Sequence, residues 1–198
     1  MELILASNNP GKLREMRAIL TEIGHEVLSQ SEAGLDFVAE EIGNTFLANA
    51  RIKAQAVVEA TGRAAIADDS GLVVEALDGA PGVDSAYYGG EACVTDRDRL
   101  MYLLRNMERE ENRKAYFVST IVCMFPDRSS IEAEGRIEGE ILREPRGEGG
   151  FGYDPIFFVP ELGMSFAELT PEVKNRVSHR ARALAQFKEK WEIYHANK

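Results

Sequence analysis

Hydrophobic residues recur along the chain in two spacings, which predict alternating β-strands and α-helices. Short apolar runs bounded by turn-forming residues predict strands, and apolar positions three or four residues apart predict helices with one buried face. The expected strands and extended segments are residues 2–6, 25–29, 64–67, 72–76, 114–125, 131–142 and 156–159, and the expected helices are residues 10–23, 44–60, 95–110 and a final helix that begins around residues 178–180. A polar turn at residues 126–129 joins two long strands as a hairpin. The pattern predicts an α/β fold with a mixed sheet, in one domain that spans residues 1–198.

The apolar run at residues 64–67 ends abruptly in Asp68 and Asp69, followed by Ser70 and a glycine. The run is too short for a helix and fits a buried strand, so we expect the two acids at the carboxyl end of that strand. Ligands bind at that edge of open α/β sheets. A simple Asp/Ser/Gly turn would explain the same residues. The local pattern leaves both interpretations open.

Composition and charge narrow the classes of partner. The chain has 198 residues and a net charge of -10, which argues against binding to duplex nucleic acid. A small anionic substrate would need local basic residues and a divalent cation. No stretch is long and apolar enough for a membrane span, so we expect a cytoplasmic protein with no membrane partner. Cys93 and Cys123 show no metal-ligand spacing and are expected to be reduced thiols.

Two lysines are candidates for phosphate binding. Asn9 suits the N-cap of the first helix and Pro10 its first position, so the free N–H groups there and the charge of Lys12 predict a phosphate-binding turn. A capped helix with a surface lysine is the plainer alternative. Lys53 shares a stripe with Asn49 on the second helix. It is the second candidate, unless it only extends to solvent.

A glycine-rich segment at residues 147–155 is the least ordinary local composition. Its glycines let a backbone approach a ligand closely, and Phe151 or Tyr153 offers a stacking surface for a base. Aromatic rings that fill the core are the alternative.

Six motifs in order resemble the inosine/xanthosine triphosphate pyrophosphatase family, and the resemblance covers nearly the whole chain. The motifs are SNNPGK, AEEIGNTFLANARIKA, ADDSGLVV, GAPGVDSA, GGFGYDPIF and VKNRVSHRARAL. One departure is Tyr87, where the family usually has arginine. The nearest alternatives are a Maf-like nucleotide pyrophosphatase, whose first loop typically reads SxSPRR, and a non-catalytic nucleotide-binding module whose acids only hold Mg²⁺.

The resemblance implies a fold and a reaction. The fold is an elongated, two-lobed α/β domain with a curved mixed sheet flanked by helices and a central active-site cleft, usually in a homodimer. The reaction is hydrolysis of ITP, dITP or XTP to the monophosphate and pyrophosphate, by attack of a metal-activated water on the α-phosphorus. This removes non-standard purine nucleotides from the pool. Mg²⁺ is the expected cofactor, with Mn²⁺ as a possible substitute.

The resemblance also assigns residues. Asp69 is the expected proton acceptor, and Glu40 and Asp69 are the expected metal ligands, with Glu41 and Asp68 as neighbours that share or replace them. The expected substrate-binding residues are Ser7, Asn8, Asn9, Pro10, Gly11, Lys12, Lys53 and Ser70 for the triphosphate, and Phe151, Gly152, Tyr153, Asp154, Lys174, His179 and Arg180 for the base and sugar.

Overall fold

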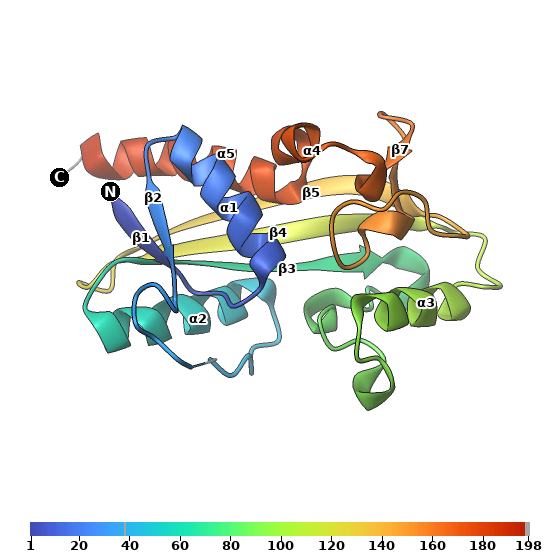
Figure 1. Ribbon diagram of the computed structural model, residues 1–198, viewed down its shortest axis with the longest axis horizontal. Coiled ribbons are helices and arrows are strands. Elements are labelled where there is room, and N and C mark those ends of the chain that lie inside the picture. Colours follow the sequence, from blue (N-terminus) through green and yellow to red (C-terminus); the bar gives the residue numbers. More distant parts are fainter. Residues whose placement is uncertain (38, 197–198) are drawn as a thin grey trace. The chain divides into compact units, whose positions relative to one another are not determined.

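The computed structural model describes residues 1–37 and 39–196, which form an α/β fold (Figure 1). The described strands are β1 (Glu2–Leu5), β2 (Glu26–Ser29), β3 (Ala65–Val74), β4 (Lys114–Met124), β5 (Ser130–Ile141), β6 (Phe157–Val159) and β7 (Met164–Ser165). The described α-helices are α1 (Pro10–Glu22), α2 (Phe46–Thr61), α3 (Asp96–Asn106), α4 (Pro171–Val177) and α5 (His179–Ala196). None of these helices is long and apolar enough to cross a membrane.

The strands form a mixed sheet, as the pattern predicts. Among the described residues the sheet has seven strands in the order β2-β1-β3-β4-β5-β6-β7. Strand β1 pairs in parallel with β2 and β3, whereas β6 pairs antiparallel with β5 and β7. The predicted hairpin is present, since β4 and β5 are neighbours and the Phe125 N–H donates to the Ser129 carbonyl at 2.9 Å between them.

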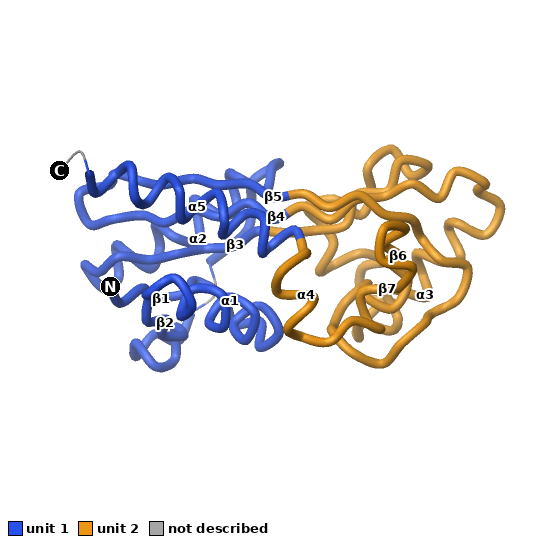
Figure 2. Tube along the Cα trace, turned by 90° about the horizontal axis from the view of Figure 1, so that it is seen from above, with its two compact units in different colours: residues 1–69, 119–135, 179–198 blue, residues 70–118, 136–178 orange. Residues whose placement is uncertain are grey.

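The chain divides into two compact units (Figure 2). Unit 1 comprises residues 1–69, 119–135 and 179–198, and unit 2 comprises residues 70–118 and 136–178. The chain passes from one unit to the other four times. The expectation of one domain over residues 1–198 stays a prediction.

In unit 1, α1 and α5 cover one side of the sheet and α2 covers the other (Figure 1), and alternate strand residues pack in the two corresponding core clusters. Leu5 and Ile66 pack in the core cluster that contains α1 and α5. Ile4, Ala65 and Ala67 pack in the cluster that contains α2, where small alanines predominate. Because successive side chains of a strand point to opposite faces, this alternation fixes the directions of the two residues that follow.

Unit 2 has a core of its own. It combines apolar residues of β3, α3, β4 and β6 with an aromatic group in which the Phe117 and Phe157 ring centroids lie 4.6 Å apart. The short helix at residues 166–168 adds Phe166 and begins with a capping box of Ser165 and Glu168. This core supports the glycine-rich segment.

The main correction concerns the strand that contains the two acids. We expected it to end at Ala67, but β3 continues to Val74, so Asp68 and Asp69 lie inside a strand and form no turn. Strand β1 ends at Leu5, opposite Ile66, and β3 extends beyond it. The polar run is compatible with a strand because its buried carboxylates have charged partners.

Smaller differences concern the ends of helices. Helix α2 begins at Phe46, two residues after the predicted start, and the hydroxyl of its N-cap Thr45 accepts from the Ala48 N–H at 3.1 Å. Helix α3 ends at Asn106, before the predicted end. The two cysteines are buried and free, as expected.

Candidate active site

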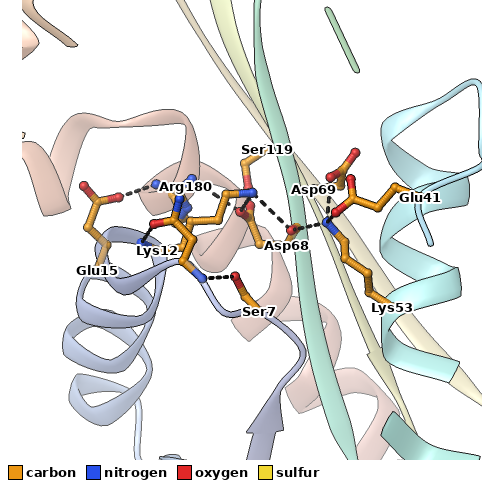
Figure 3. A network of polar contacts seen from close by, with 10 residues as sticks. Ser7, Lys12, Glu15, Glu41, Lys53, Asp68, Asp69, Ser119 and Arg180 are labelled. Atoms are coloured by element: carbon orange, nitrogen blue, oxygen red, sulfur yellow. Dashed lines mark hydrogen bonds and ion pairs between the residues drawn. The ribbon is translucent and has the colours of Figure 1, made fainter. Parts of the chain in front are cut away.

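Asp68 and Asp69 point to opposite sides of β3 (Figure 3). Asp68 follows Ile66 by two residues and meets α1 and α5, while Asp69 follows Ala67 by two residues and meets α2. The strand therefore creates two different acidic environments from adjacent residues.

On the first side, Asp68 is completely buried and surrounded by donors. Its Oδ2 lies 3.1 Å from the Nζ of Lys12 and 3.3 Å from Nη2 of Arg180, and its Oδ1 accepts from the hydroxyl of Ser119 at 2.5 Å. Burial alone would raise the pKa of Asp68, but Arg180, Lys12 and the Ser119 hydrogen bond together hold it well below its usual value. Asp68 therefore stays ionised and is a poor proton acceptor.

The charge pairing continues to Glu15, which the sequence analysis did not single out. The guanidinium of Arg180 is only 2% exposed and pairs with the carboxylate of Glu15 as well as with Asp68. Glu15 follows Lys12 by three residues on α1, so both can face the same neighbour. This spacing was the one available signal, but acidic residues on a helix are usually solvated.

On the second side, Asp69 pairs with Lys53. The Lys53 Nζ lies 2.6 Å from Oδ1 of Asp69 and 3.3 Å from Oε1 of Glu41, and it donates to the Asp68 carbonyl at 3.0 Å. The other oxygen, Asp69 Oδ2, is buried and has no hydrogen-bond partner within the described residues. A buried oxygen of this kind needs a ligand, because leaving it unsatisfied is costly.

The pKa directions on this side differ from those at Asp68. Burial raises the pKa of Asp69, and the Glu41 carboxylate adds to the increase, although the charge of Lys53 opposes it. Burial alone would lower the pKa of Lys53, but Asp69 and Glu41 together outweigh it and raise the pKa. Asp69 is thus the more basic of the two adjacent aspartates.

The residues around Asp69 fit a magnesium ion. The described residues contain no cluster of three or more His, Cys, Asp or Glu side chains that would enclose a metal by themselves. Mg²⁺ often binds through only one or two carboxylates together with water and substrate phosphates. Asp69 Oδ2 and the Glu41 carboxylate match this requirement. Glu40 is exposed. Within the described residues, its side chain has no hydrogen bond or ion pair.

The first turn of α1 adopts the predicted capped geometry. Asn9 is the N-cap and accepts from the Lys12 N–H at 3.0 Å, Pro10 occupies the first turn, and Ser7 accepts from the Asn9 N–H at 3.2 Å. Asn8 donates to the Phe37 carbonyl at 3.4 Å. Lys12 is not the surface lysine of the plainer alternative, since its Nζ contacts buried Asp68.

Unit 2 brings together three of the predicted base-binding residues. The Lys174 Nζ lies 2.5 Å from Oδ2 of Asp154, which also accepts from the Phe151 N–H at 2.8 Å. The same ammonium lies 4.8 Å from the centroid of the Phe151 ring. A Cβ at Gly150 would come within 2.0 Å of the Asp154 carboxylate, so glycine is required there.

The two aromatics of the glycine-rich segment have different roles. Tyr153 is buried in the core of unit 2 and its hydroxyl donates to the Ser85 carbonyl at 2.8 Å, which matches the core-filling alternative. Phe151 is only partly buried, so it does not fill the core as Tyr153 does.

The remaining predicted residues have defined places. Ser70 lies on β3 at the start of unit 2, and His179 is a buried residue that begins α5 in unit 1. Tyr87, the departure from the family pattern, is 64% exposed in unit 2.

A sequence profile of the Ham1 family matches residues 3–190, nearly the whole chain. The chain belongs to the Ham1 family. Among its relatives, a dITP/XTP pyrophosphatase of Thermus thermophilus is 51% identical over 191 residues, which cover 96% of this chain and 91% of that protein. A dITP/XTP pyrophosphatase of a Nostoc species is 50% identical over 184 residues, which cover 92% of this chain and 90% of the relative.

The Ham1 fold is also found in a solved structure. The Staphylococcus aureus Ham1 protein matches with a TM-score of 0.85 at 40% identity, covering 97% of this chain and 98% of that one. The family resemblance inferred from the six motifs and the α/β fold with a mixed sheet are both confirmed.

Proposed function

We propose that this chain hydrolyses dITP, XTP and ITP to the nucleoside monophosphate and pyrophosphate. The observation that carries the proposal is the buried Asp69, which has Lys53 on one oxygen and, within the described residues, no partner on the other. The substrate class is supported by membership of the Ham1 family. It is also supported by two relatives, 51% and 50% identical to this chain, that are named dITP/XTP pyrophosphatases.

In the reaction, Asp69 accepts a proton from the attacking water. The water oxygen forms a bond to the α-phosphorus, the bond from that phosphorus to the oxygen bridging to the β-phosphorus breaks, and pyrophosphate leaves with the bonding electrons. Lys53 fixes the Asp69 carboxylate in place through Oδ1.

Magnesium is the proposed cofactor, with manganese as the alternative. Asp69 and Glu41 would hold it, and we prefer Glu41 to Glu40 because only Glu41 contacts Lys53, the partner of Asp69. When bound, the ion offsets the charge of the triphosphate and acidifies the attacking water.

The triphosphate would bind the charged residues and the capped turn of unit 1. Lys12 and Lys53 supply positive charge, and residues 7–12 supply N–H groups at the start of α1. Asp68 orients the Lys12 ammonium and remains anionic, so it serves as an anchor and not as a base. Ser70 would add a hydroxyl contact.

The base would stack on Phe151 in unit 2, with Asp154 and Lys174 fixing that ring. Discrimination against ATP follows if a donor from His179 or Arg180 meets the 6-oxygen of hypoxanthine or xanthine, because adenine has an amino group there and would leave the donor unpaired. Arg180 already pairs with Glu15 and Asp68. Its role in reading the base stays a prediction, as do the homodimer and the cytoplasmic location.

A substrate panel tests the proposal. We expect pyrophosphate release from dITP, XTP and ITP with Mg²⁺. Release from ATP should be at least about tenfold slower, because a buried donor left unpaired costs about 1–3 kcal/mol. Preference for pyrimidine nucleotides would favour the Maf-like alternative, and tight binding of dITP without release would favour a binding module.

A further inference from the structure

The Phe151 ring lies on a backbone segment that two carboxylates hold in place. The Phe151 N–H donates to Oδ2 of Asp154 at 2.8 Å, and the next N–H, that of Gly152, donates to Oδ2 of Asp96 at 2.8 Å. All of these residues belong to unit 2. We infer that Asp96 is a positioning residue that fixes the orientation of the Phe151 ring for stacking with a purine base. The inference rests on the function proposed above and assigns its specificity to one more residue.

The segment needs such anchors because of its glycines. Gly150 and Gly152 flank Phe151 with φ angles of +73° and +60°. Glycine enters this region at little steric cost, but it also has the greatest freedom to leave it. Each of the two hydrogen bonds restrains the backbone beside one of these hinges. Without Asp96, the Gly152 N–H loses this hydrogen bond, and the backbone that follows Phe151 is less restrained.

Asp96 is not needed to cap its own helix. Helix α3 has a complete capping box, in which Asp98 accepts from the Thr95 N–H at 2.7 Å and the Thr95 hydroxyl accepts from the Asp98 N–H at 3.2 Å. The carboxylate of Asp96 is therefore available for contacts outside the helix.

Arg99 fixes the direction of the Asp96 carboxylate. Its Nη2 lies 2.7 Å from Oδ1 of Asp96, and its Nη1 donates to the carbonyls of Cys93 and Val94 at 3.0 and 3.2 Å. The side chain of Arg99 is mostly buried, which limits its alternative positions. One oxygen of Asp96 thus meets Arg99, and the other is directed to Gly152.

The experiment compares Asp96→Ala and Asp96→Asn with Asp98→Ala in the full chain. Asp98→Ala removes the capping box of the same helix without touching Gly152, so it reports on helix stability alone. For each variant we would measure kcat and KM for dITP, the inhibition constant of tripolyphosphate, which has no base, and the melting temperature.

We expect Asp96→Ala to raise KM for dITP by about 3- to 10-fold, the range of the net effect of one typical hydrogen bond. The tripolyphosphate constant should stay within twofold, since only the base contact is lost. Asp96→Asn should lie between wild type and Asp96→Ala, because its amide oxygen still accepts from Gly152. Asp98→Ala should lower the melting temperature and leave KM unchanged.

Several results would overturn the inference. An unchanged KM in Asp96→Ala, equal weakening of tripolyphosphate, or the same KM change in Asp98→Ala would each do so. A lower KM in both Asp96 variants would show that Asp96 acts only through its negative charge, because removing that charge weakens the repulsion of an anionic substrate. That result would also overturn the inference. In the Phe151→Ala background, the KM effect of Asp96→Ala should disappear, and full additivity would also overturn the inference.

Failure of the proposed function has a different signature. Wild-type protein that releases no pyrophosphate from dITP, XTP or ITP would refute the function itself. Normal wild-type turnover with an insensitive Asp96 would refute only the positioning role.

Discussion

The carboxylates of Asp68 and Asp69 lie on opposite faces of strand β3, although the residues are consecutive. Asp68 pairs with Lys12 and Arg180, and Asp69 pairs with Lys53. The pleat of one strand therefore separates an anchoring acid, whose pKa is lowered, from a more basic acid, whose pKa is raised.

Asp69→Asn should abolish most turnover without unfolding the protein. Pyrophosphate release from dITP should fall by about 10²- to 10⁴-fold, the usual effect of losing a general base. The fold should persist because Lys53 keeps Glu41 as a partner at 3.3 Å. Circular dichroism would confirm the fold, and hydrolysis near the wild-type rate would exclude Asp69 as the proton acceptor.

Asp68→Asn should act mainly on stability. The substitution removes the negative charge that pairs with the buried side chains of Lys12 and Arg180. Because breaking a buried ion pair is costly, the free energy of unfolding at pH 7 should fall by about 3 kcal/mol. Urea titrations of both proteins would measure this loss. A loss below about 0.5 kcal/mol, the scale of exposed ion pairs, would contradict the anchoring role.

The pH dependence of that difference has a definite sign. The folded protein holds the pKa of Asp68 below its unfolded value, so the stabilisation is present above the unfolded pKa of about 3.9 and is lost as the pH falls toward the folded pKa. The free energy of unfolding of the wild type should thus exceed that of Asp68→Asn by a constant amount from pH 7 to 5. The difference between the two free energies should become smaller below about pH 4.

Glu41→Gln and Glu40→Gln form a matched pair that tests the metal ligand. We expect Glu41→Gln to raise the Mg²⁺ concentration for half-maximal activity by about tenfold or more, in the range seen for disturbed metal sites. Glu40→Gln removes the same charge one residue away, and it should change the Mg²⁺ concentration for half-maximal activity less than twofold. The reverse order would restore Glu40 as the ligand.

Lys53→Met should shift the pH profile of kcat/KM. The charge of Lys53 opposes the burial that raises the pKa of Asp69, so its removal raises that pKa further. Asp69 is then protonated up to a higher pH, and the acidic limb should move upward by about one unit, the effect of one nearby opposite charge. Lys53→Arg keeps the charge and should leave the limb in place. An unshifted limb in Lys53→Met would mean that another group controls it.

Local signals in the sequence predicted much of the fold. Hydrophobic spacing located most strands and helices, and Asn9 and Thr95 mark the starts of α1 and α3 because capping depends on neighbouring residues. The continuous strand β3 was missed because Asp-Ser-Gly is a turn signal when its partners are unknown. Those partners come from α1, α2, β4 and α5.

The candidate site was less predictable where contacts span the chain. Glu15 and Arg180 are 165 positions apart, and Ser119 and Asp68 are 51 apart. No periodicity connects such pairs. Glu40 and Glu41 are equivalent by sequence pattern, and only the position of Lys53 distinguishes them.

The contribution of α5 to the buried charges also has a consequence for synthesis of the protein. Arg180, which pairs with Glu15 and Asp68, belongs to residues 179–198, the last segment of unit 1 to be translated. Until that segment emerges from the ribosome, two acids meant for the interior lack their guanidinium partner. The amino-terminal part of unit 1 must therefore remain incompletely packed until α5 has been synthesised and has emerged.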